Sequence, residues 1–175
     1  DNASDPHLWH TLKEHHIEAS MIELEENMGF SGGFSAGLDH AAMLGYEFIL
    51  MLNNDIQISG DAIGRLREVL ASHSGIAVVG PAILEDDGHR ARYFCGGRDP
   101  GRYLQSRVDC PAEPSSDKLL NVGYVPGMVW LCRSSIWRQY GPFDPAYFYS
   151  GEVADFCYRL SIGGWVAAVD PAVQA

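Results

Sequence analysis

A run of five apolar residues, 48–52, is followed directly by three polar residues, Asn53, Asn54 and Asp55. An unbroken apolar run of this length predicts a strand buried on both faces, as in a parallel sheet covered by helices. Ligands of open α/β sheets bind just beyond the carboxyl ends of the strands. One carboxylate with neighbouring amide oxygens suits a hard divalent cation that itself holds phosphate. The alternative is a polar turn whose Asn and Asp side chains bond to the local backbone.

Similar patterns predict strands and helices in alternation along the rest of the chain. The expected strands are 20–24, 47–52, 76–79 before a stop at Gly80-Pro81, 122–132 with an interruption at Pro126-Gly127, and 165–169. The expected helices are 5–16, one from the loop 25–33 to Gly45, one capped by Ser59 with Ile63, Leu66, Val69 and Leu70 on one face, 134–140, and one from Ser150 to about 163. Residues 90–121 predict a loop with short strands. This alternation predicts an α/β fold in a single domain, 1–175.

Composition is that of an ordinary globular protein, with 46% hydrophobic and 20% charged residues in a chain of 175. The formal net charge of -11 argues against nucleic acid or an anionic membrane surface as the main partner. It leaves room for a phosphorylated ligand, because backbone amides and a metal ion can override the overall field locally.

The four cysteines, Cys95, Cys110, Cys132 and Cys157, are widely spaced and form no C-x-x-C pair. This spacing fits neither a zinc knuckle nor a dense disulfide scaffold. We therefore expect buried free thiols in a reducing compartment.

A glycine-rich segment, 27–37, connects a predicted strand to a predicted helix. Glycines allow a ligand to approach the backbone closely, and a helix N-terminus favours an anion. The spacing is neither the dinucleotide fingerprint nor a P-loop. A tight turn with close helix packing is the alternative explanation.

Glu152 and Asp155 are three residues apart at the start of a predicted helix, and hence on one face. The positive end of the helix dipole favours their ionised forms, which is what a general base needs. Acidic residues in a first helical turn also occur for stability alone. The preceding aromatic run, 147–149, would provide a surface for a sugar ring and favours the catalytic interpretation.

Three segments, in this order, resemble those of the family 2 glycosyltransferases, which have the GT-A fold, and especially the rhamnosyltransferase-like branch. The first is the glycine-rich stretch, with Asn27, Gly29, Gly32, Gly33, Ala36 and Gly37. The second is the sequence Leu52 to Asp55, which is similar to the family's metal-binding D-x-D motif. The third is the acidic segment 147–159, which contains Glu152, Asp155, Cys157 and Arg159. The sequences 141–144 and 79–81 are similar to the family's G-x-F-D and V-G-P.

The resemblance implies a GT-A fold, Rossmann-like, with a mostly parallel sheet and flanking helices. It implies metal-assisted, inverting transfer of a sugar from a nucleotide diphosphate to an acceptor hydroxyl. Asp55 with Asn53 would hold Mg²⁺ or Mn²⁺, and Glu152 or Asp155 would be the base. The residues expected at the nucleotide-sugar are Asp1, Asn27, Gly32, Gly33 and Asn54.

The implied partners are a UDP- or dTDP-sugar donor and a glycan or lipid-linked acceptor, with no nucleic acid. The implied location is cytoplasmic, at the inner face of the membrane with peripheral association, and the implied role is cell wall polysaccharide biosynthesis.

Three departures from the family's pattern change the expectation. Val153 replaces the second acidic residue of the E-D pair, and Ser35 replaces a common Asn. The family's first strand, first helix and second strand are absent, which predicts a fragment that lacks the first strands, with an unpaired edge beside the 47–52 strand. The alternative function is a non-catalytic nucleotide-sugar binding module or an inactive fragment.

Overall fold

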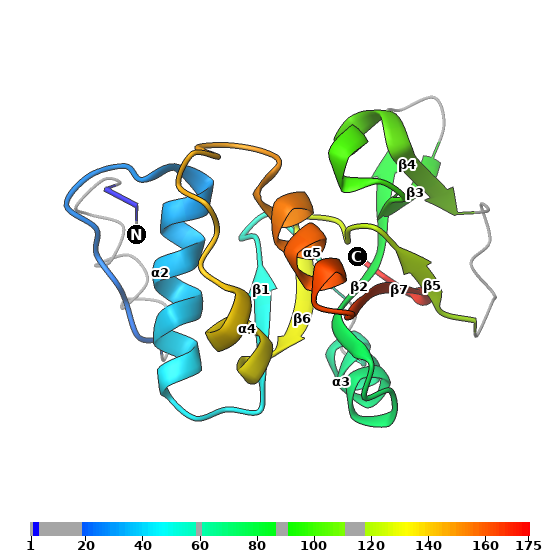
Figure 1. The fold of residues 1–175 in the computed structure, drawn as a ribbon, viewed down its shortest axis with the longest axis horizontal. Helices are drawn as coiled ribbons and strands as arrows, with labels where there is room; N and C mark the ends of the chain where they lie inside the picture. The colour runs from blue at the N-terminus through cyan, green and yellow to red at the C-terminus, as the bar shows by residue number, and fades with distance from the viewer. Residues whose placement is uncertain (1, 4–18, 59–60, 87–90, 111–117) are drawn as a thin grey trace.

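Strands that are apolar on both faces form the centre of a mixed sheet (Figure 1). β2 (Ile76–Asp86) pairs antiparallel with β6 (Val129–Arg133) and parallel with β7 (Val166–Gln174). β1 (Phe48–Leu52) pairs antiparallel with β6. The structure is a computed structural model that describes residues 2–3, 19–58, 61–86, 91–110 and 118–175.

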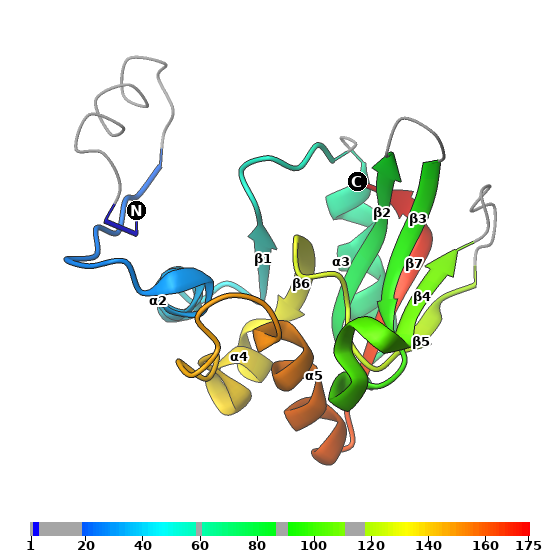
Figure 2. The same cartoon turned by 90° about the horizontal axis from the view of Figure 1, so that it is seen from above.

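The other strands extend this sheet from β2 and β7. The far half of β2 pairs with β3 (Ala91–Gly97), β3 pairs with β4 (Arg107–Cys110), and β5 (Leu120–Val122) pairs with β7, all antiparallel. β3 and β4 lie on the side of the molecule away from α2 (Gly29–Met43) (Figure 2).

The two faces of the sheet carry two apolar cores. Residues 130–132 of β6 and 166–169 of β7 alternate between these cores, as the two-residue period of a strand requires, whereas Ala77 and Val78 of β2 both belong to the larger one. Val78 and Trp130 belong to the larger core, and Val79 and Leu131 to the smaller one. α2, α4 (Ser134–Tyr140) and α5 (Glu152–Ile162) supply residues to the larger core, and α3 (Ala62–Ser72) to the smaller.

The α/β class is confirmed, but the expected mostly parallel sheet is wrong. Among the described strands the one parallel pairing is β2 with β7. β6 runs antiparallel between β1 and β2, a direction that apolar patterning does not encode because side-chain alternation is the same in both.

The prediction that 48–52 is buried on both faces is also wrong. β1 has β6 as its single partner among the described strands, and its residues alternate between half-buried and buried until Leu52, which is exposed. The unpaired edge expected beside this strand is therefore present in the described part of the chain.

Several predicted boundaries need correction. Residues 20–24 form no strand, since no described segment pairs with them. The helix after the glycine-rich loop begins inside it, at Gly29. β2 continues through Gly80-Pro81 with a register shift after Pro81. The interruption near 126–127 is long enough to divide the predicted 122–132 strand into β5 and β6.

The helices predicted within the described residues are confirmed in type and differ in detail. α4 and α5 lie close to the expected ranges, but α5 begins after Gly151 (φ 100°) and has no capping bond from Ser150. Leu66, Val69 and Leu70 are buried as expected, whereas Ile63 is exposed and Ala62 takes its place in the core. Ser59 and the 5–16 helix lie outside the described residues. Among the described residues, no helix is long and apolar enough to span a membrane.

The four cysteines divide into two kinds. Cys132 and Cys157 are free and buried, as expected. Burial raises the pKa of Cys157 to about 12 and also raises that of Cys132. The expectation of free thiols is wrong for Cys95 and Cys110, which form a disulfide between β3 and β4. Adjacent strands bring their Cα atoms to 6.0 Å, a pairing that sequence spacing alone does not reveal.

The disulfide should contribute measurably to stability. It closes a segment 15 residues apart in sequence, and loss of a cross-link of that span costs about 3 kcal/mol through the entropy of the unfolded chain. We expect reduction, or the double substitution Cys95→Ala with Cys110→Ala, to lower the free energy of unfolding by about that amount in a urea titration. Reductant should have no further effect on the double variant. Equal unfolding midpoints for oxidised and reduced wild-type protein would contradict this.

Candidate functional site

The glycine-rich segment is held by the side chain of Asn2. Asn2 Nδ2 donates to the backbone oxygen of Gly29 at 2.8 Å and to Asn27 Oδ1 at 3.0 Å, and Asn2 Oδ1 accepts from the backbone N–H of Met28 at 2.8 Å. Asn27 Oδ1 also accepts from the N–H of Gly29. A side chain on Gly33 would meet the Asn2 amide at 3.2 Å. Asp1, predicted at the nucleotide, precedes Asn2 and lies outside the described residues.

The aromatic segment 147–149 lies against the start of α2, a contact that sequence spacing does not show. The N–H of Phe30 donates to the backbone oxygen of Phe148 at 2.8 Å, and the Ser31 hydroxyl donates to that of Tyr147. Gly29 (φ 68°) permits the approach, because a Cβ there would collide with the Phe148 carbonyl.

Beside this contact is a cavity of about 600 Å³. Its lining includes Asn27, Gly33, Phe34, Phe148 and Tyr149, so two of the predicted nucleotide-sugar residues face the same space. Gly32 packs against Met28 instead. Asn53, Asn54 and Asp55 are absent from this lining.

The three polar residues after β1 differ in their surroundings. Asn54 and Asp55 are exposed in a turn. The N–H of Asn53 donates to the backbone oxygen of Met128 at 2.9 Å, just before β6. Asn53 Oδ1 is buried and has no hydrogen-bond partner within the described part of the chain.

Glu152 begins α5 and is only 5% exposed. Burial raises the pKa of its carboxyl, and hydrogen bonds from backbone groups of 150, 152 and 153 oppose part of that rise. Its Oε2 atom is buried and lacks a hydrogen-bond partner among the described residues. A buried, unpartnered carboxylate oxygen is costly to stability and is typical of a group kept for chemistry.

Asp155, one turn later, has different surroundings. Arg159 Nε donates to its Oδ2 at 2.9 Å, and the same guanidinium donates to the backbone oxygens of Tyr140 and Pro142. Asp155 therefore forms part of a bridge between α5 and the turn after α4. Of the two candidate bases, Glu152 is the one with a buried carboxylate oxygen that has no hydrogen-bond partner among the described residues.

The two departures from the family pattern have structural explanations. Ser35 is buried, and its hydroxyl oxygen accepts from the N–H of Phe143 at 3.2 Å, which ties α2 to the 141–145 turn. Val153 is buried in the larger core, and a side chain on Gly127 would lie 3.6 Å from its Cγ2 atom. The start of α5 thus lies beside the segment that also bonds to Asn53.

The residues after β1 supply oxygen donors of the kind that bind a divalent cation. No group of three or more His, Cys, Asp or Glu side chains able to hold a metal occurs among the described residues. Asp55 and the unpartnered Asn53 Oδ1 are nevertheless hard oxygen donors of the kind Mg²⁺ uses when substrate phosphates and water complete its shell.

Two tertiary contacts have no counterpart in the sequence patterns. Asp170 is 1% exposed and accepts from Arg65 Nε at 2.7 Å, which joins β7 to α3. Tyr103 packs on Tyr124 with ring centroids 5.1 Å apart. Asp170 and Arg65 are 105 residues apart in sequence, and Tyr103 and Tyr124 are 21 residues apart. Local patterns therefore carried no signal for either contact.

The model of glycosyl transferase family 2 matches residues 1–139. The chain belongs to this family. Its curated relatives include N-acetylglucosaminyl-diphospho-decaprenol L-rhamnosyltransferase of Mycobacterium tuberculosis, 25% identical over 73% of this chain and 46% of the relative. Galactofuranosyltransferase GlfT1 of Mycolicibacterium smegmatis is 25% identical over 94% of this chain and 55% of the relative. The chain thus spans about half the length of these family members.

A crystal structure of GalNAc-T7 with UDP, GalNAc and Mn²⁺ superimposes with a TM-score of 0.75 at 15% identity. The alignment covers 98% of this chain and 35% of that one. The expected GT-A fold is confirmed.

The raised pKa of Glu152 predicts a pH-dependent effect of Glu152→Gln on stability. The folded state binds this proton more tightly than the unfolded chain. Wild-type stability therefore falls as the pH rises from the ordinary glutamate pKa, about 4.3, to the raised folded value. Because glutamine does not ionise, the melting temperature of the variant relative to wild type should increase across that window and then level off. A pH-independent difference between Glu152→Gln and wild type would contradict the assignment.

Proposed function

We propose that this family 2 chain transfers a sugar from a nucleotide-diphosphate donor to an acceptor hydroxyl with inversion. One observation carries the proposal. Asn53 and Glu152, predicted on opposite sides of the reaction, each retain a buried side-chain oxygen with no partner among the described residues. Substrate groups would satisfy both atoms.

The donor side would use the carboxyl end of β1. Asp55 and Asn53 would hold Mg²⁺ or Mn²⁺, which when bound to the diphosphate lowers the negative charge on the leaving group. UDP and Mn²⁺ are named with the GalNAc-T7 structure, which supports a UDP-sugar here, with a dTDP-sugar as the other donor considered. Asn54 would contact the diphosphate, and the cavity beside Asn27 and Gly33 would receive the nucleotide.

On the acceptor side Glu152 would act as the base. Its unpartnered Oε2 accepts the acceptor's hydroxyl proton, and the acceptor oxygen forms a bond to the anomeric carbon from the face opposite the diphosphate. The bond to the diphosphate breaks with its electron pair, so a single displacement inverts the configuration. A raised pKa matches the base to neutral pH better than an ordinary carboxylate does. Asp155, whose Oδ2 is bonded to Arg159, would position the helix.

The acceptor class follows from the relatives. Their names specify a lipid diphosphate carrying N-acetylglucosamine and galactofuranosyl transfer, which supports a glycan or lipid-linked acceptor in cell wall polysaccharide biosynthesis. We also propose that the protein acts at the inner face of the membrane. Residues 1–175 are proposed to form one domain.

A non-catalytic nucleotide-sugar binding module is the second candidate. It is favoured by Val153, which is buried in the core where the family has an acidic residue. Donor binding in calorimetry without turnover would select this candidate.

The metal assignment predicts the effect of Asp55→Ala in the full chain. Loss of the carboxylate should lower the rate of UDP-sugar turnover with Mn²⁺ by at least about 100-fold and abolish the Mn²⁺ dependence of UDP binding in calorimetry. Glu68→Ala removes an exposed carboxylate on α3 and should leave both unchanged. Unaltered turnover in Asp55→Ala would exclude the metal role.

The base assignment predicts a different pattern for Glu152→Gln. Transfer should fall by about 10²–10⁴-fold, the usual contribution of a general base, while UDP binding is retained. Loss of UDP binding together with transfer would place Glu152 on the donor side and contradict its role as the base.

A further inference from the structure

A second cavity, of about 720 Å³, lies between α5 and the short 3₁₀ helix η1 (Pro100–Ser106). Its lining residues include three tyrosines, Tyr103, Tyr147 and Tyr158, and two aspartates, Asp99 and Asp155. The aromatic segment 147–149 separates the two cavities, because Tyr147 lines this one while Phe148 and Tyr149 line the cavity beside α2.

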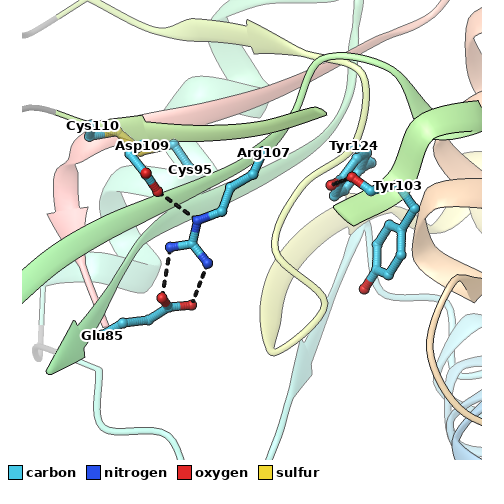
Figure 3. A network of polar contacts seen from close by, with 7 residues as sticks. All are labelled: Glu85, Cys95, Tyr103, Arg107, Asp109, Cys110 and Tyr124. Carbon is cyan, nitrogen blue, oxygen red and sulfur yellow. Dashed lines mark hydrogen bonds and ion pairs between the residues drawn. A yellow bond between two sulfur atoms is a disulfide. The ribbon is translucent and has the colours of Figure 1, made fainter. Parts of the chain in front are cut away.

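The η1 wall of this cavity is built on a network of polar contacts (Figure 3). Arg107, directly after η1, donates to both carboxylate oxygens of Glu85, at 2.7 and 3.1 Å, and to Asp109 at 2.6 Å. These contacts raise the pKa of the guanidinium. Next to Asp109 the disulfide of Cys110 joins β4 to β3, so one end of η1 is fixed by ion pairs and a covalent bond.

Hydrogen bonds also hold the N-terminal end of η1, at Asp99, and its residue Tyr103. Ser106 Oγ donates to the backbone oxygen of Asp99 at 2.8 Å and accepts from the N–H of Asp99 at 3.0 Å. These two bonds connect the last residue of η1 to the residue that precedes it. The Tyr124 hydroxyl donates to the backbone oxygen of Tyr103, and the two rings pack at 5.1 Å (Figure 3). The position of Tyr103 is therefore preorganised.

The α5 wall is equally well defined. Gly151 (φ 100°) leaves room for the Tyr147 ring, which an added Cβ would meet at 3.0 Å. The preceding Ser150 has a φ of 73°, rare for a residue with a side chain, and its hydroxyl donates to that of Tyr103 at 3.4 Å across the cavity mouth. Arg159 holds Asp155 in place. Tyr158 remains 52% exposed.

Aromatic rings with carboxylates between them recognise a particular chemistry. The face of a tyrosine ring is electron-rich and attracts the polarised C–H groups of a sugar, and carboxylate oxygens accept from vicinal hydroxyls. A preformed cavity of several hundred Å³ is of the size that binds small ligands. Among the described residues that line the cavity there is no Lys or Arg, which disfavours a phosphate group.

We propose that this cavity binds a sugar unit of the acceptor, stacked on Tyr158 and Tyr147. The site rests on the proposed function, since it would place an acceptor next to Gly151, the residue that precedes the proposed base Glu152. The 90–110 region, which carries η1, then belongs to acceptor selection.

Binding can be measured without catalysis, by saturation-transfer NMR on the full chain with methyl glycosides of glucose, galactose, N-acetylglucosamine and rhamnose. At least one of these should bind the wild type, and Tyr158→Ala should weaken that binding about tenfold, equivalent to about 1.4 kcal/mol. Tyr158→Phe, which retains the ring, should stay within about threefold of wild type. Tyr158→Leu should resemble Tyr158→Ala, so the result does not depend on one variant.

Tyr46→Ala is the matched control, because Tyr46 is an exposed tyrosine that does not line this cavity, and it should bind as the wild type does. Equal affinities for Tyr158→Ala and Tyr46→Ala, or no binding of any of the glycosides, would overturn the proposal. UDP calorimetry on the same samples tests the proposed function separately: UDP binding with no glycoside binding rejects this cavity alone, and glycoside binding without UDP binding rejects the transferase.

Discussion

The packing of aromatic rings around Phe156 holds the candidate site together. Trp130 of β6 stacks on Phe156 of α5 at 5.9 Å, and Trp137 of α4 and Phe143 of the following turn pack on the same ring at 5.4 and 5.8 Å. Each such pair contributes about 0.5–1.5 kcal/mol beyond burial. Since these rings belong to the sheet, both helices and the turn between them, they fix where α5 begins.

Polar contacts also connect α2 and α5 to the turn after α4. Arg159 ties α5 to the backbone of Tyr140 and Pro142, and Ser35 ties α2 to Phe143. The aromatic segment 147–149 is thus attached at both sides, to α2 and, through Ser150 and Tyr103, to η1. Both cavities share this segment as a wall, so the proposed donor and acceptor sites depend on one loop.

The site also contains groups that the fold does not satisfy. The buried oxygens of Asn53 and Glu152 lack partners among the described residues, whereas each carboxylate oxygen of the buried Asp170 accepts a hydrogen bond. An unsatisfied buried oxygen costs about 1–3 kcal/mol. Such a cost is tolerated where a substrate supplies the missing partner, which links the energetics of the fold to the proposed chemistry.

Local patterns determined much of this protein. The apolar runs placed β1 and the start of β2, cap and breaker residues placed α4 and α5 within a few residues, and the motif order identified the family that the match over 1–139 shows. Strand direction, the edge position of β1 and the Cys95–Cys110 disulfide depended on the tertiary structure. Glu152 and Asp155 looked equivalent in sequence. Only the tertiary structure showed that Glu152 is buried with an oxygen that lacks a partner among the described residues, and that Asp155 is bonded to Arg159. The reason is physical: periodicity and residue type record what each residue contributes to its own helix or strand, whereas burial, pairing and electrostatic surroundings come from segments far away in the chain.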